Sequence, residues 1–138
     1  MNKAVLLSVH PKYAEMIVSG KKRVEFRRVW ASEDVDTLVI YATSPVKRIL
    51  GIARVKRIHI GSPSHMWKIA KKLNGGVTRD QLFKYLNGKA SAIGIELEGI
   101  VRLPERAKPI SLFGKNFKPP QSFRYLKEKE KNLLDSLI

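Results

Sequence analysis

The amino-acid sequence predicts an α+β fold, with a strongly curved, mixed β-sheet and short helices. Five or six segments show strand patterns, and a few short helical stripes lie between them. Hydrophobic residues make up 43% and charged residues 28% of the 138 positions, which is typical of a globular chain that can bury a core. We therefore expect a single domain over residues 1–138, with residues 109–138 as a C-terminal extension that ends in a helix.

The first elements expected are a strand over residues 4–9 and a short amphipathic helix over residues 11–19. The strand segment is a continuous apolar run, which favours burial on both faces. Pro11 suits the first turn of a helix, and Gly20 stands where a left-handed residue would end it. This glycine should therefore separate the helix from the next strand.

A strongly basic strand is expected over residues 23–27, directly after this helix. Its alternation with period two places Val24 and Phe26 on one face, and Glu25 with two arginines on the other. The cations around this single carboxylate are Lys21, Lys22, Arg23, Arg27 and Arg28. Such a density of positive charge is costly unless solvent, counter-ions or an anionic ligand screens it. Periodicity leaves open whether the charged face points into a cleft or to solvent.

The remaining elements are long strands and short helices. Apolar strands are expected over residues 37–42, 49–60 and 90–101, with helices over residues 63–73 and from residue 79 on. The second of these helices starts with a capping pattern, in which Gln81 follows three residues after Thr78. The apolar stripes of both helices indicate core packing.

The charge balance favours an anionic partner. The chain has 27 Lys and Arg against 12 Asp and Glu, a formal net charge of +15 that is spread along its length, as in domains that bind nucleic acid. With no cysteine and three scattered histidines, there is no disulfide or metal-binding pattern, so no metal and no cofactor are expected. No apolar run reaches the about 20 residues that cross a bilayer. The expected location is the cytoplasm, with no membrane contact.

The order of the elements and two motifs carry a family resemblance. The helix that ends in Gly20-Lys21-Lys22 leads into the charged strand, and two long strands then enclose a helical insert. The tail that follows, residues 117–126, contains two prolines and three aromatic residues. Over roughly residues 3–126 the chain resembles the ASCH family of the PUA-like superfamily, in its longer archaeal and bacterial form. The resemblance implies a PUA-like β-barrel with a cleft that binds RNA or a modified nucleotide.

The resemblance also suggests a catalytic alternative. Small bacterial amidohydrolases of this family, which deacetylate N4-acetylcytidine, use a lysine and a threonine from a glycine-basic-Lys-Thr-x-Thr pattern. Lys22 falls on that lysine but Glu25 replaces the second threonine, so the same acyl-enzyme route is not expected. Glu25 could instead act as general base on water while Lys22 stabilises the oxyanion, with an acylated nucleoside or RNA as substrate. The purely structural alternative is an exposed Lys22–Glu25 ion pair at a strand edge.

The residues expected to contact nucleic acid lie mostly around the first helix and the basic strand. Cations would position phosphates, an aromatic ring would hold an unstacked base, and the tail would either bond a base edge or be tied to the barrel. The set is His10, Lys12, Lys21, Lys22, Arg23, Arg27, Arg28, Trp30, Arg54, Gln121 and Ser122. The expected partner is RNA or an RNA-derived nucleotide, with DNA as an alternative and the oligomeric state open. A third hypothesis is a transcription-linked or translation-linked accessory factor that meets another protein through its tail.

Overall fold

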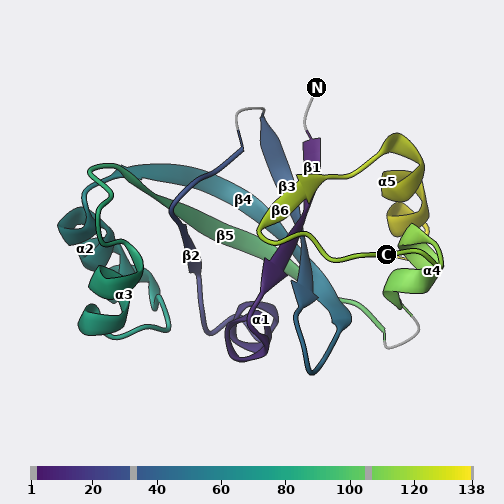
Figure 1. Cartoon of the computed structure of the whole chain (residues 1–138), viewed down its shortest axis with the longest axis horizontal. Coiled ribbons are helices and arrows are strands. Elements are labelled where there is room, and N and C mark those ends of the chain that lie inside the picture. The colour runs from purple at the N-terminus through teal and green to yellow at the C-terminus, as the bar shows by residue number, and fades with distance from the viewer. Residues whose placement is uncertain (1–2, 32–33, 105–106, 138) are drawn as a thin grey trace.

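The computed structural model describes residues 3–31, 34–104 and 107–137. In chain order the elements are β1 (Lys3–Val9), α1 (Pro11–Val18), β2 (Val24–Arg27), β3 (Val35–Ala42), β4 (Arg48–Gly61), α2 (Pro63–Leu73), α3 (Arg79–Tyr85), β5 (Ala92–Arg102), α4 (Pro109–Phe113), β6 (Phe123–Tyr125) and α5 (Glu128–Asp135). The described strands form a six-stranded sheet in the order β2-β5-β4-β3-β1-β6. β1 and β3 run parallel, and the other neighbouring strands are antiparallel. The sheet is curled (Figure 1), so the predicted α+β fold with a curved, mixed sheet is confirmed.

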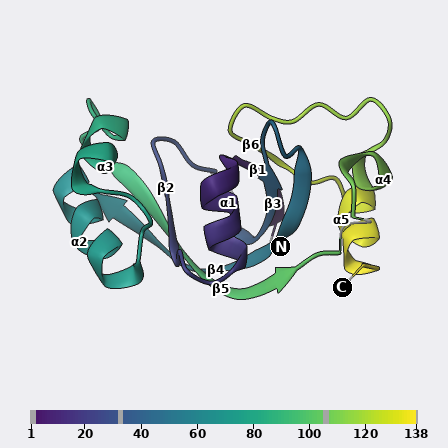
Figure 2. The ribbon, with the colours of Figure 1, turned by 90° about the horizontal axis from the view of Figure 1, so that it is seen from below.

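Helix α1 lies inside the curve of the sheet, between β2 and β1 (Figure 2). Its buried residues Ala14, Ile17 and Val18 pack against apolar side chains of β1, β3, β4 and β5. Just after the helix, Gly20 has a φ of +81°, a left-handed conformation that glycine adopts readily. This turn directs the chain from α1 into β2, which forms one edge of the sheet.

Strand β1 is buried on both faces, as its continuous apolar run predicts. Val5 and Leu7 face the core under α1, whereas Leu6 faces a second core on the opposite side of the sheet. That second core includes Leu112 of α4 and Leu134 of α5. These two helices gather at one end of the molecule in Figure 1, and α2 and α3 gather at the other. No helix in the described part of the chain combines the length and apolarity that a membrane crossing requires.

Helices α2 and α3 cover the apolar face of β2. Val24 and Phe26 of this strand pack into a third core that these helices supply. Helix α2 spans the residues predicted for it, and α3 begins with the predicted capping box between Thr78 and Gln81. Because the apolar face of β2 is turned to these helices, the alternating charged face is turned toward the inside of the curved sheet.

Candidate functional site

Three charged residues of the basic segment are buried. Glu25 and Arg27 on β2 are each 8% exposed, and Lys22 just before the strand is 2% exposed. The alternative of a solvent-exposed Lys22–Glu25 pair is therefore wrong. Because a buried charge is unfavourable unless it is paired and hydrogen-bonded, the partners of these three groups determine how the site is built.

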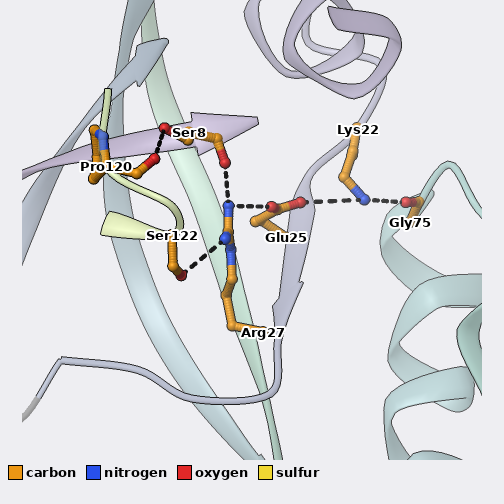
Figure 3. Close-up of polar contacts among 7 residues, drawn as sticks. All are labelled: Ser8, Lys22, Glu25, Arg27, Gly75, Pro120 and Ser122. Carbon is orange, nitrogen blue, oxygen red and sulfur yellow. Dashed lines mark hydrogen bonds and ion pairs between the residues drawn. The ribbon is translucent and has the colours of Figure 1, made fainter. Parts of the chain in front are cut away.

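The three side chains form a continuous series of alternating charges (Figure 3). Lys22 Nζ lies 3.7 Å from Oε1 of Glu25, and Nη2 of Arg27 lies 3.1 Å from Oε2. Lys22 Nζ also donates a hydrogen bond to the carbonyl of Gly75, in the loop after α2. Each carboxylate oxygen of Glu25 thus faces one cation, and the carboxylate holds both cations in place.

The guanidinium of Arg27 connects β2 to β1 and to the C-terminal segment. Nη2 donates to the carbonyl of Ser8 at 2.8 Å, and Nη1 donates to the hydroxyl of Ser122 at 3.2 Å. The Ser8 hydroxyl donates to the carbonyl of Pro120 at 2.7 Å, and the Ser8 backbone N–H donates to the carbonyl of Ser122 at 3.0 Å. Ser122 therefore ties the tail to the sheet. Nε of Arg27 is buried and has no hydrogen-bond partner among the described residues.

A cavity of about 300 Å³ opens beside this charged series. Its lining residues are His10, Tyr13, Lys22, Glu25, Phe26, Arg27, Val77, Gln81, Leu82 and Tyr85. Lys22 Nζ lies 5.3 Å from the ring centre of Tyr13 and 5.4 Å from that of Phe26, within the range of cation–π attraction. Small-molecule pockets measure about 300 to 1,000 Å³, so this cavity suits a ligand of one or two rings.

Burial changes the acid–base behaviour of two cavity residues. Desolvation lowers the pKa of the Lys22 ammonium below its usual value, and the attraction of Glu25 offsets part of this shift. The Lys22 proton is therefore easier to remove than that of an exposed lysine. Desolvation also raises the pKa of the Tyr85 phenol. At neutral pH this hydroxyl stays protonated and is able to donate a hydrogen bond to a ligand.

The structure brings part of the predicted binding set to this cavity. His10 lines the cavity, and its Nδ1 accepts a hydrogen bond from the backbone N–H of Lys12 at 3.3 Å, which caps α1. Lys22 and Arg27 line it as well, and Ser122 contacts Arg27. Lys12 itself lies outside the cavity with Lys21, in a neighbouring groove between α1 and α2.

Two predicted arginines, Arg23 and Arg28, lie next to the cavity residues in sequence but do not line the cavity. Arg23 lines a groove on the other flank of α2, and its guanidinium donates to the carbonyl of Lys72 at 3.2 Å. Arg28 donates to the carbonyls of Tyr85 and Asn87, at 2.8 Å each. It therefore binds the C-terminal end of α3, where helix carbonyls lack intrahelical partners.

The remaining predicted residues lie away from the cavity. The ring of Trp30 packs against Phe123 at a centroid distance of 4.9 Å, because β6 brings the tail alongside β1. Arg54 donates to the Thr37 hydroxyl at 2.7 Å. Gln121 is exposed and does not line the cavity. Trp30 therefore lies outside this cavity, and its contact with nucleic acid stays a prediction.

Sequence reasoning missed the contribution of α3 and its preceding loop. Val77, Gln81 and Tyr85 all line the cavity. Gln81 and Tyr85 are four residues apart on α3, the spacing that places side chains on one face of a helix, and Val77 lies in the loop just before it. A second stripe on α3, beside its apolar one, was therefore the available signal for Gln81 and Tyr85.

A curled, mixed six-stranded sheet with a basic cavity beside its edge strand defines a PUA-like domain. The ASCH domain model matches residues 7–131, and the chain belongs to the ASCH domain family. The predicted family is thereby confirmed.

Comparison with known proteins places this chain near a bacterial relative. It is 33% identical to an ASCH domain-containing ribonuclease of Zymomonas mobilis over 141 residues, which cover 98% of this chain and 92% of that protein. The crystal structure of ASCH from Zymomonas mobilis matches with a TM-score of 0.86 at 31% identity, covering 98% of this chain and 95% of that one. The N-terminal domain of Staphylothermus marinus McrB shares the fold, with a TM-score of 0.58 at 12% identity over 99% of this chain and 94% of that one.

Proposed function

We propose that the cavity binds an unpaired base of an RNA strand, or a nucleotide derived from RNA. The observation that carries this proposal is the buried Lys22–Glu25–Arg27 series beside a small cavity with aromatic walls. Proteins that recognise single-stranded RNA stack splayed bases on aromatic rings and hydrogen-bond to their edges. Tyr13 and Phe26 supply ring surfaces. Gln81 and Tyr85, which line the cavity with polar side-chain groups, supply hydrogen-bond partners for a base edge.

Two further facts favour RNA over an uncharged small molecule. The formal net charge of +15 favours a polyanionic partner. The Zymomonas mobilis relative is named as a ribonuclease, so an RNA ligand has a precedent within the family. We propose the cytoplasm as the compartment of this function, because RNA and its nucleotides are available there.

A binding gel tests this proposal. Single-stranded RNA, duplex RNA and single-stranded DNA of one sequence are incubated with the protein at two salt concentrations, and bound and cleaved species are scored together. We expect single-stranded RNA to bind more tightly than the duplex, because a base must leave its stack to enter the cavity. We expect binding to weaken as salt rises. Equal affinity for single strands and duplex would contradict the proposal, and equal affinity for RNA and DNA would remove RNA as the specific ligand.

A second candidate function is catalysis, either RNA cleavage or hydrolysis of an acylated nucleoside, favoured by the lowered pKa of Lys22 and by the ribonuclease name of the relative. In RNA cleavage by transesterification a base removes the 2′-hydroxyl proton, the 2′ oxygen attacks phosphorus to form a 2′,3′-cyclic phosphate, and the bond to the 5′ oxygen breaks as that oxygen takes up a proton from solvent. The neutral Lys22 amine would accept the first proton, and Arg27 would stabilise charge on the phosphoryl oxygens.

On an acylated nucleoside, Glu25 would activate water while Lys22 stabilises the oxyanion. Because both oxygens of Glu25 face cations, it is better placed to position Lys22 than to take a proton.

The cleaved species on the same gel separate these functions. If Lys22 is the base, cleavage rises with pH as its amine loses the proton, in a range below the usual lysine pKa. Lys22→Met then abolishes cleavage while binding persists. Cleavage at the parent rate in Lys22→Met would remove Lys22 from the chemistry, and binding with no cleavage at any pH would leave a binding module.

A further inference from the structure

A second groove lies next to the cavity, between α1 and α2. Its volume is about 620 Å³, against about 300 Å³ for the cavity. Its lining residues are Lys12, Met16, Lys21, Trp67, Ala70, Lys71, Asn74, Gly75, Gly76, Val77, Thr78 and Gln81. The groove therefore has about twice the volume of the cavity.

The groove and the cavity share a wall. Val77 and Gln81 line both of them. Gly75 also separates them, since its carbonyl accepts a hydrogen bond from Lys22 on the cavity side while the residue lines the groove. A β-carbon on Gly75 would lie 2.8 Å from the Ala70 β-carbon and 3.0 Å from the Phe26 ring, so only bare backbone fits there. A ligand in the cavity is thus one thin loop away from the groove.

The chemistry of the groove suits nucleotides. Three exposed lysines, Lys12, Lys21 and Lys71, line it, and none of its described lining residues carries a carboxylate. Trp67 is half-buried on α2, with Lys71 Nζ 5.8 Å from its ring centre. An aromatic ring beside lysines is the combination that holds single-stranded nucleic acid, because bases stack on the ring and the cations contact phosphates.

We propose that this groove holds the nucleotides adjacent to the base in the cavity, with one base stacked on Trp67. The ligand is accordingly a single-stranded RNA segment of at least about three nucleotides, and a mononucleotide would occupy only part of the site. This inference rests on the proposed function of the cavity. It adds the substrate class, a single strand that runs from the cavity along α2.

Helix α2 provides a matched control. On its other flank Lys68 and Lys72 line a separate groove that contains a carboxylate, Glu96. Glu96 lies 3.4 Å from Nε of Arg57 and 2.9 Å from Nε2 of His59. The double variant Lys68→Glu/Lys72→Glu therefore makes the same change in net charge as Lys21→Glu/Lys71→Glu, with both substitutions on the helix that carries Lys71, but outside the proposed path.

The experiment measures affinity for RNA homopolymers of each base, one, three and six nucleotides long. For the base that binds best, we expect the hexamer to bind about tenfold or more tightly than the monophosphate, because stacking and phosphate contacts are added. Trp67→Leu and Lys21→Glu/Lys71→Glu should each weaken hexamer binding about tenfold and leave the monophosphate nearly unchanged. Trp67→Phe keeps a stacking ring and should restore hexamer affinity.

Three outcomes overturn the inference in distinguishable ways. Equal affinity for the monophosphate and the hexamer would show that the groove does not bind RNA, while binding in the cavity would stand. Equal losses of hexamer affinity in the Lys21/Lys71 and Lys68/Lys72 variants would show that the lysines attract RNA by charge in general, and that the strand does not follow this groove. No binding of any RNA would remove both this inference and the proposed function. Because the lysines are exposed, their variants keep the test valid even if Trp67→Leu fails to fold.

Discussion

Replacing Glu25 with glutamine is expected to lower the free energy of unfolding by about 3 to 5 kcal/mol, the cost of removing one member of a buried ion pair. The amide keeps the shape of the side chain but removes the charge between Lys22 and Arg27. Both cations then remain buried at close range with no anion between them. Urea denaturation of the parent and the variant measures the difference.

An exposed pair supplies the control for this measurement. Glu15 lies 2.7 Å from Nη2 of Arg102, but both side chains are at least half exposed, so Glu15→Gln should cost only about 0 to 1 kcal/mol. Adding Lys22→Met to Glu25→Gln should recover part of the loss, because one uncompensated charge disappears. If Glu25→Gln is no more destabilising than Glu15→Gln, the buried charged series does not have the energetics inferred for it.

Replacing Arg27 with lysine is expected to weaken RNA binding by about 10- to 100-fold, which corresponds to losing about one charged hydrogen bond. The charge is kept, but an ammonium cannot contact Ser8, Ser122 and Glu25 together as Nη1 and Nη2 of the guanidinium do. Charge reversal at this position would be a poorer test, because a glutamate would lie beside Glu25. Fluorescence anisotropy with labelled single-stranded RNA measures the change.

The same substitution at a neighbouring position isolates the effect of the cavity. Arg23→Lys changes an exposed arginine in the groove on the far flank of α2, and we expect its affinity to stay near that of the parent. Parent-like binding by Arg27→Lys, or an equal loss in Arg23→Lys, would show that the guanidinium of Arg27 does not contact the ligand.

Much of the fold is predictable where a single periodicity dominates. Residues 63–73 carry one apolar stripe, and the helix observed has these bounds. The capping pattern of Thr78 and Gln81 likewise locates the start of α3. The sequence does not predict which face of β2 points into the molecule, because alternation with period two favours neither side. The orientation is decided by α2 and α3, which cover Val24 and Phe26 and so turn Glu25 inward.

The sequence indicated which charged side chains of the candidate site to consider, but not the long-range contacts that position them. Lys22 and Glu25 follow from a local pattern, but Lys22 also depends on the carbonyl of Gly75, which lies 53 positions further along the chain. A backbone acceptor leaves no side-chain signal in the sequence. The position of Trp30 away from the cavity has a related reason, since the three-residue strand β6 places Phe123 against it. Long-range pairing of so short a strand has no local signature.

Photo-crosslinking tests most directly whether a base enters the cavity. Single-stranded RNAs that carry 4-thiouridine or 6-thioguanosine are bound, irradiated and digested, and the modified peptides are identified by mass spectrometry. Binding in the cavity predicts crosslinks at Tyr13 or Tyr85, whose rings line it from α1 and α3. Crosslinks confined to Trp30 or to the tail, with none at the cavity residues, would contradict the proposed site.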